Sequence, residues 1–458
     1  MVETYTNFLG GSPLNRLSWL RTSHPFLNTV LLSPTTRWIV FRGGEPLLAT
    51  EPNAGPRSLA RLTTADVRSL LGPEPFFAQG KEPDETAEEG VSVLEAARFR
   101  GPPVVFLGLH EPQTGDAGAL PSSDFSAKGD SSSVVGKIEG TPYFSVDLTD
   151  VETEAVDQVL AGFEAGKSGV KLEFVEPRAA MQTFDLYQAA VFAEARSMVD
   201  WNSRNKFCPS CGSPVYSLWA GWKLTCSSLL PWADNTGRKP CPTAKGLHNF
   251  AHPRTDAVVI MAVIDESGEK ILLGRNKKWP GKFYSTLAGF IEPGESFEDA
   301  VKRELWEEAG VKVWDVKYHS TQPWPYPANL MVGFYATADA SQPIRVDLDN
   351  ELEDARWYTR DEILTVLNHA AGATLTDRDH KKMAEVQEAG GTAPKSASTA
   401  KLLAGDSTKS TDKLEEGPQE VPFRVPPLTA IAGVLISQWA HRQEGPGSGA
   451  AQVQKGNL

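Results

Sequence analysis

The sequence has no apolar run that reaches the ~18 residues of a membrane-spanning helix. Its first residues also lack the basic region and apolar core of a secretory signal. There is no surplus of basic residues either, because 45 Lys and Arg stand against 58 Asp and Glu and leave a net charge of −13. Such a chain binds neither nucleic acid nor an anionic membrane by bulk charge, so no membrane partner is expected. A phosphate-rich substrate would need a metal cation to bridge the like charges.

Cysteine is scarce, with four residues in 458, which excludes a scaffold built on disulfides. All four lie between Cys208 and Cys241. The Cys208-x2-Cys211 pair is typical of half of a tetrahedral zinc site. Residues 215–225 predict a hairpin that turns at 220–221 and brings Cys226 back to this pair.

The second half of the predicted zinc site is less regular. Fourteen residues separate Cys226 from Cys241, and His248 is an alternative fourth ligand. A redox CxxC or unrelated buried cysteines would also give this pattern, but redox pairs normally sit at a strand-to-helix turn. Four protein ligands leave no open position, so we expect a structural Zn²⁺ ion.

The most informative segment is 289–311, GFIEPGESFEDAVKRELWEEAGV. Its composition predicts a helix that starts near Ser296 and stops at a glycine. On that helix Glu304, Glu307 and Glu308 occupy positions i, i+3 and i+4 and share one face. Like charges this close repel each other unless a cation binds among them, and carboxylates suit Mg²⁺ or Mn²⁺. Three glutamates alone would indicate a solvated acidic face instead.

The residues around the glutamates favour the metal site. With Gly289, Glu295, Arg303 and Gly310 at fixed spacing, the segment resembles the signature of the Nudix hydrolase family at every defining position. The resemblance implies an α/β/α sandwich that hydrolyses a nucleoside diphosphate linked to another moiety. The resemblance also implies five catalytic residues: Glu295, Arg303, Glu304, Glu307 and Glu308. In the family, Glu304 and Glu308 would bind the metal ions, and Glu308 or a neighbour would activate the water. Arg303 and Glu295 would brace the helix and the loop before it. The carbonyl of Ala288 is a metal ligand in close relatives.

A second motif follows at 321–329, TQPWPYPAN. Prolines at three alternate positions remove backbone donors, so the motif cannot be an interior strand and predicts a stiff, extended, polyproline-like wall. Such a wall could be only a packing brace. Behind the glutamates, however, it resembles the SQPWPFPxS element of NudC-type NADH pyrophosphatases, in which a four-cysteine zinc ribbon also precedes the glutamates. The resemblance assigns substrate binding to Gln322, Pro323, Trp324, Pro325, Tyr326, Pro327, Ala328 and Asn329.

The same resemblance carries four further positions over to this chain. Phe290 would stack on a base, and His252 falls where relatives place an aromatic residue. Glu351 matches a downstream metal glutamate, although by itself it would indicate only a surface acid before a strand. Ala432 lies where the backbone of a C-terminal helix meets the substrate.

Local patterns along the chain predict the remaining organisation. Strands are expected at 29–32, 37–41, 104–107 and 143–146, and helices at 183–204 and 428–439. The composition of 112–137 predicts a long loop, and that of 372–419 a disordered insert. The expected fold class is α/β (α+β), in four parts: an N-terminal mixed, Nudix-like α/β domain (1–182), a linking helix with a small zinc ribbon (183–252), a Nudix α/β/α sandwich (253–443) and a flexible tail (444–458).

These features predict Mg²⁺- or Mn²⁺-dependent hydrolysis of the pyrophosphate of NADH and NAD to nicotinamide mononucleotide and AMP. Two alternatives stay open: removal of NAD caps from RNA 5′ ends by the same cleavage, and a zinc-ribbon interaction protein with an inactive Nudix fold. None of the catalytic glutamates is missing, which argues against the second alternative. The resemblance implies a homodimer. The final residues 456–458 match a peroxisomal signal only weakly, so both cytoplasm and peroxisome are expected locations.

Overall fold

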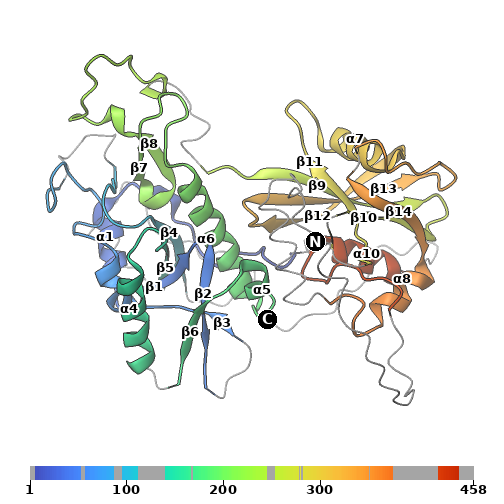
Figure 1. Cartoon of the computed structure of the whole chain (residues 1–458), viewed down its shortest axis with the longest axis horizontal. Helices are drawn as coiled ribbons and strands as arrows, with labels where there is room; N and C mark the ends of the chain where they lie inside the picture. The colour runs from blue at the N-terminus through green and yellow to red at the C-terminus, as the bar shows by residue number, and fades with distance from the viewer. Residues whose placement is uncertain are drawn as a thin grey trace, which may run out of the picture. The chain divides into compact units, whose positions relative to one another are not determined.

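The computed structural model describes residues 6–52, 57–86, 95–111, 140–166, 169–244, 253–277, 279, 282–349, 351–374 and 421–442. The chain divides into two compact units, of which the first is Met1–Ala257 with Gln322–Leu330 and the second is Val258–Thr321 with Met331–Leu458 (Figure 1). Some predictions lie outside the described residues: the loop at 112–137, the insert from 375 onward, the tail, His248 and His252.

The first unit is built on a six-stranded sheet in the order β3-β2-β1-β5-β4, with β6 also paired to β2. Strand β1 runs parallel to β5, whereas β1–β2 and β4–β5 are antiparallel pairs. Its strands are β1 (Arg37–Arg42), β2 (Glu45–Thr50), β3 (Ser58–Leu59), β4 (Val104–His110), β5 (Thr141–Asp147) and β6 (Lys171–Phe174). The helices described around it are α1 (His24–Leu32), α2 (Thr64–Val67), α4 (Thr153–Gly166), α5 (Pro177–Met181) and α6 (Leu186–Arg204).

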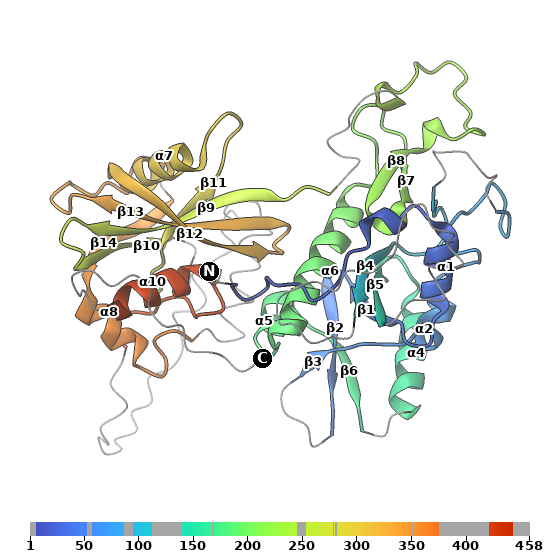
Figure 2. The same cartoon turned by 180° about the vertical axis from the view of Figure 1, so that it is seen from behind.

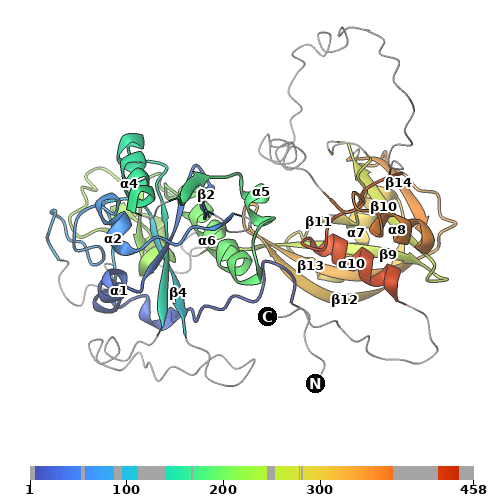
Figure 3. The ribbon, with the colours of Figure 1, turned by 90° about the horizontal axis from the view of Figure 1, so that it is seen from below.

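Alternate residues of the strands enter two cores, one on each face of this sheet. Trp38 and Phe144 belong to the core that packs against α1, and their rings stack at 5.1 Å. Ile39 and Phe41 point to the opposite core, where they pack against α6. Figure 3 shows α1, α2 and α4 on one side of the strands and α6 on the other. Because successive side chains of a strand point to opposite faces of the sheet, these strands pack against helices on both sides. The first unit therefore has three α/β/α layers.

Three of the four strands predicted here are confirmed, as β1, β4 and β5, and the predicted helix at 183–204 is α6. The strand predicted at 29–32 is wrong, because these residues end α1. The side chain of Ser23 caps that helix by accepting the N–H of Phe26. Four buried residues then recur at helical spacing: Phe26, Leu27, Val30 and Leu31. A run of four residues, three of them apolar, is too short to distinguish the period of a strand from that of a helix.

The second unit also contains a six-stranded sheet, in the order β12-β13-β9-β10-β14, with β11 paired to β9. Helix α7 covers one face, and α8 and α10 cover the other (Figures 1 and 2). The predicted α/β/α sandwich is therefore confirmed. Its strands are β9 (Asp256–Asp265), β10 (Lys270–Asn276), β11 (Leu287–Phe290), β12 (Val313–Trp324), β13 (Asn329–Ala338) and β14 (Leu352–Thr359), and its helices are α7 (Phe297–Ala309), α8 (Arg360–Leu367) and α10 (Ile431–His441).

The C-terminal helix begins three residues later than predicted. Residues 428–430 form a turn, in which the N–H of Ala430 donates to the carbonyl of Pro427 at 3.0 Å. From Ile431 onward, α10 packs with α8 into one core beneath the sheet. None of the helices in the described part of the chain combines the length and the apolar character that crossing a membrane requires.

Leu47→Ala should lower the free energy of unfolding by about 2–5 kcal/mol, because this side chain of β2 is fully buried and its loss leaves a cavity. Leu186→Ala makes the same truncation at a side chain that is 55% exposed, and should change stability by less than ~0.5 kcal/mol. Urea denaturation followed by tryptophan fluorescence measures both. Equal effects of the two variants would contradict this placement of the core.

Candidate functional site

Helix α7 forms where its end signals predict. The side chain of Ser296 accepts the N–H of Asp299, and the Asp299 carboxylate accepts the N–H of Ser296, so two free donors of the first turn are satisfied. Gly310 ends the helix with φ +66°, a left-handed conformation that glycine adopts without strain. These two signals fix which residues of the helix turn toward the sheet.

Arg303 connects the helix to the loop that precedes it. Its Nε and Nη2 atoms donate to the two carboxylate oxygens of Glu295 at 2.6 and 2.8 Å, a bidentate pair. Nη2 also donates to the carbonyl of Phe290 at 2.8 Å, and Nη1 donates to Glu304 at 2.8 Å and to Glu307 at 3.0 Å. The hydrogen bonds from Arg303 hold the pKa of Glu295 at about 2, so that this pair stays ionised. Arg303 therefore holds the helix carboxylates and the preceding loop in fixed positions relative to each other.

Glu308 is the buried acid of the site, with 4% of its surface exposed. Its carboxylate accepts one hydrogen bond, from the N–H of Ala288 at 3.3 Å. Burial, followed by the negative charges of Glu351 and Glu304, raises the pKa of Glu308 well above its usual value. No Lys or Arg among the described residues forms an ion pair with it. A divalent cation fits this surplus of oxygen donors and negative charge.

Gly289 allows the helix carboxylates to approach strand β11. A Cβ atom at this position would lie 1.8 Å from Cδ of Glu304 and about as close to both carboxylate oxygens. Glu304 is thus pressed against the backbone of Gly289. Burial raises the pKa of Glu304 even though Arg303 bonds to it.

Glu351 reaches the same group of charges from another part of the sheet. It immediately precedes β14, and its carboxylate accepts a hydrogen bond from Nδ2 of Asn276 at 2.9 Å. Its backbone N–H donates to Asp349 at 2.9 Å, and its charge raises the pKa of both Glu304 and Glu308. Sequence reasoning missed Asn276 and Asp349, because only the pairing of β10 with β14 brings Asn276 here.

The acids and the cysteines differ in how tightly they are assembled. The four Sγ atoms of the cysteines lie within 4.8 Å of one another. Among the described residues, no other group of three or more His, Cys, Asp or Glu side chains has its ligand atoms this close together. The glutamates are coupled through their charges instead. An ion at the glutamates would therefore have to draw their carboxylates together.

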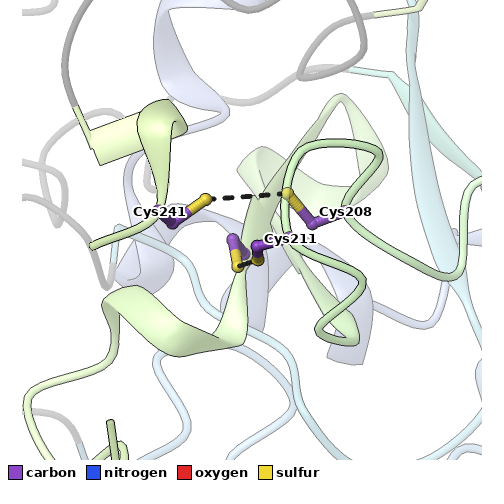
Figure 4. Close-up of side chains that lie close together, drawn as sticks. Cys208, Cys211 and Cys241 are labelled. Carbon is purple, nitrogen blue, oxygen red and sulfur yellow. Dashed lines mark hydrogen bonds between the residues drawn. The ribbon is translucent and has the colours of Figure 1, made fainter. Parts of the chain in front are cut away.

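Three separate segments bring the four cysteines together. The Sγ atoms of Cys208 and Cys241 lie 3.7 Å apart (Figure 4). The Sγ atoms of Cys211 and Cys226 lie 3.4 Å apart. These distances exceed the ~2.05 Å of a disulfide, and all four residues are free thiols. Hydrogen bonds to Ser213 lower the pKa of the Cys211 thiol to about 6, which favours the thiolate that metals bind. The group can hold a metal ion with Cys241 as fourth ligand.

The predicted hairpin between the cysteines is confirmed as β7 (Val215–Leu218) and β8 (Lys223–Cys226). Its turn contains Trp219, Ala220 and Gly221, all with positive φ. A side chain on Gly221 would meet Val105 of β4 at 2.7 Å, so glycine is required by close packing as well as by φ. The turn therefore fixes the ribbon to the first unit and returns Cys226 to Cys211.

The proline-rich motif is not the extended wall that was predicted. Its first residues end β12 and Asn329 starts β13, so 325–328 form the turn of a hairpin. Strand β12 lies at the edge of its sheet, where Pro323 interrupts no interior pairing. Excluding an interior strand was correct, but alternating prolines did not predict the reversal of the chain at 325–328.

Several side chains of this hairpin tip are buried within the first unit. Gln322 is 1% exposed, and its Nε2 donates to the carbonyl of Phe8 at 2.8 Å. The hydroxyl of Tyr326 contacts Sδ of Met181 at 3.3 Å, and the guanidinium of Arg178 lies 4.4 Å from the centre of its ring. Such contacts are those expected of a packing brace. Substrate binding by the tip stays a prediction.

Two other residues assigned by resemblance lie in the second unit. Phe290 follows Gly289 on β11 and is 54% exposed, so its ring is free to stack on a base. Ala432 lies near the start of α10 and is buried, which leaves its backbone rather than its side chain for contact with a ligand.

Gly289→Ala should lower turnover by about 100-fold or more, because the new methyl group must displace the Glu304 carboxylate. Gly162→Ala is the control, since a Cβ atom there has no neighbour within 4 Å. Steady-state rates and a thermal melt of each variant separate loss of activity from loss of fold. Normal turnover in Gly289→Ala would contradict the close contact.

Comparison with known proteins gives two domain matches. Residues 253–378 match the NUDIX domain, and residues 35–201 match the NADH pyrophosphatase-like rudimentary NUDIX domain. The chain is 34% identical over 362 residues to the NAD-capped RNA hydrolase of Schizosaccharomyces pombe, covering 79% of this chain and 85% of that protein. It is 32% identical over 380 residues to NAD-capped RNA hydrolase NPY1 of Saccharomyces cerevisiae, covering 81% and 89%.

A further relative has a higher sequence identity over a shorter aligned segment. NAD-capped RNA hydrolase NUDT12 of Homo sapiens is 49% identical over 180 residues, which cover 39% of this chain and 36% of that protein. The two domain matches and the long alignments agree with the glutamate helix and the cysteine group described above. The chain belongs to the Nudix hydrolase family, as a NudC-type enzyme that joins a rudimentary Nudix domain to a complete one.

Proposed function

We propose that this enzyme hydrolyses the pyrophosphate of NADH and NAD to nicotinamide mononucleotide and AMP, and that it cuts the same bond to remove NAD caps from RNA 5′ ends. The observation that carries the proposal is the buried carboxylate of Glu308, which feels the negative charges of Glu304 and Glu351. Among the described residues, no Lys or Arg forms an ion pair with Glu308. The relatives aligned over most of their length are named NAD-capped RNA hydrolases, which supports the cap as a second substrate.

The carboxylates of Glu304, Glu308 and Glu351 and the carbonyl of Ala288 would hold Mg²⁺ or Mn²⁺, since all are hard oxygen donors. Such ions would supply positive charge that lowers the pKa of the attacking water and neutralises the phosphates of the substrate. The crowding of like charges, which raises the pKa of Glu304 and Glu308, supports this assignment.

The other side chains position the reactants. Arg303 holds Glu304 and Glu307 on the helix and fixes the loop through Glu295, so the carboxylates keep their orientation. Phe290 offers an exposed ring for stacking on a nucleoside. Glu308 is the first candidate to accept the proton of the water, and Glu307, with 47% of its side chain exposed, is the second.

The direct test is an acid-quenched HPLC assay of NADH, NAD, FAD, ADP-ribose and NAD-capped RNA with Mg²⁺ or Mn²⁺. We expect cleavage of NADH and of the cap, and a loss of about 100-fold or more in Glu308→Gln because a metal ligand and base is removed. Glu298→Gln removes an exposed acid from the first turn of the same helix and should leave the rate unchanged. Full turnover by Glu308→Gln would refute the assignment, and an inactive wild type would favour the interaction protein.

We infer that the cysteine group holds a structural Zn²⁺, because tetrahedral coordination by four thiolates is typical of that ion. Elemental analysis of the purified protein should find about one zinc per chain. Cys241→Ser should lose the ion and lower the melting temperature, whereas His248→Ala should keep both. Zinc loss in His248→Ala with retention in Cys241→Ser would show that the histidine is the fourth ligand.

The proposal also includes a homodimer and a cytoplasmic or peroxisomal location. Both are supported by the family resemblance alone.

A further inference from the structure

The end of strand β10 holds Glu351, one of the three proposed metal-binding acids, by two hydrogen bonds. Nδ2 of Asn276 donates to Oε1 of the Glu351 carboxylate at 2.9 Å, and the backbone N–H of Lys277 donates to the carbonyl of Glu351 at 3.3 Å. The backbone N–H of Glu351 donates in turn to the carboxylate of Asp349 at 2.9 Å. Both the backbone and the side chain of Glu351 are therefore fixed to neighbouring segments of the second unit.

An irregularity in the pairing of β10 with β14 brings Asn276 to this position. The pairing is regular along the rest of β10, and if it continued without a shift, Asn276 would lie opposite Glu353. The register instead shifts between Arg275 and Asn276, so that Asn276 lies opposite Leu352, the neighbour of Glu351. Such β-bulges change the direction of a side chain and are frequent next to active sites.

The amide group of Asn276 is suited to orienting a metal ligand. Glu351 is exposed, and fixing an exposed glutamate side chain in one rotamer when an ion binds costs conformational entropy. The hydrogen bond restricts the carboxylate in advance. Because the amide donor carries no net charge, it leaves the negative charge of the carboxylate for the ion, whereas a Lys or Arg at this position would compete with the ion.

We propose that Asn276 is a positioning residue, which acts through Glu351 to raise the affinity of the glutamate site for its divalent cation. The inference rests on the metal site of the proposed function. Hydrogen-bond partners of metal ligands typically contribute about 10- to 100-fold to metal affinity. Glu351 would be held by the ion itself once an ion is bound, so Asn276 contributes to metal binding rather than to the chemical step.

The test is Asn276→Leu, which removes the donor and keeps the approximate shape of the side chain. Binding of Mn²⁺ to the full chain, followed by the EPR signal of the free ion, should weaken about tenfold or more. The Mg²⁺ concentration for half-maximal turnover of NADH should rise by a similar factor, and kcat at saturating Mg²⁺ should equal that of the wild type. Asn276→Gln keeps an amide donor and should recover part of the affinity.

Two further variants separate positioning from a purely structural effect. Asn15→Leu removes an amide that donates to the Glu111 carboxylate at 3.2 Å in the first unit, and should leave Mn²⁺ affinity unchanged. In a Glu351→Gln background, Asn276→Leu should cause no additional loss of Mn²⁺ affinity, because Asn276 acts only through the Glu351 carboxylate. A thermal melt in EDTA checks that each variant is folded.

Three results would overturn the inference. The first is an unchanged Mn²⁺ affinity in Asn276→Leu. The second is a further loss of affinity when this change is added to Glu351→Gln, because Asn276 would then act on the ion by another route. The third is a lower kcat with an unaltered Mg²⁺ requirement, which would place Asn276 in contact with the substrate instead.

Failure of the proposed function can be told apart from failure of this inference, because Mn²⁺ binding is measured without substrate. A lower Mn²⁺ affinity in Glu308→Gln identifies the glutamates as the site of binding. If the wild type binds Mn²⁺ there but cleaves neither NADH nor capped RNA, the proposed function fails, while weaker binding by Asn276→Leu still supports the inference. If Glu308→Gln binds Mn²⁺ as tightly as the wild type, the metal site and the inference both fail.

Discussion

The structure of the site depends on one unfavourable interaction, the burial of the Glu308 carboxylate beside two further acids. Removing a carboxylate from water is costly, and placing Glu304 and Glu351 nearby increases the cost. The chain offsets part of it with one backbone N–H, from Ala288. A divalent cation bound among the three carboxylates would offset their mutual repulsion. The same acids that destabilise the metal-free site would then serve as its metal ligands.

The rest of the site keeps this arrangement in place. Arg303 holds four partners at once and fixes both the loop before the helix and the carboxylates upon it. Gly289 has no side chain, so helix and strand come close enough for Glu304 to lie against the backbone. The capping box at Ser296 and the left-handed Gly310 set the ends of the helix and thereby the direction in which each glutamate points.

Much of this could be predicted from the sequence, because the decisive signals are local. The helix ends, the shared face of Glu304 and Glu308 and the cysteine hairpin each follow from spacing over a few residues. What could not be predicted depends on tertiary contacts. Asn276 reaches Glu351 only through the pairing of two strands distant in sequence. The strand expected at 29–32 is helical because residues before it cap and continue a helix. The proline motif turns back on itself, and its Gln322 is buried against Phe8, a residue more than three hundred positions away.

The central claim is that the acids around Glu308 bind divalent cations. The most direct measurement is anomalous diffraction from crystals grown with Mn²⁺ and a non-hydrolysable dinucleotide. The account predicts manganese peaks beside the carboxylates of Glu304, Glu308 and Glu351. Manganese found elsewhere, with no peak beside any of these three side chains, would contradict it.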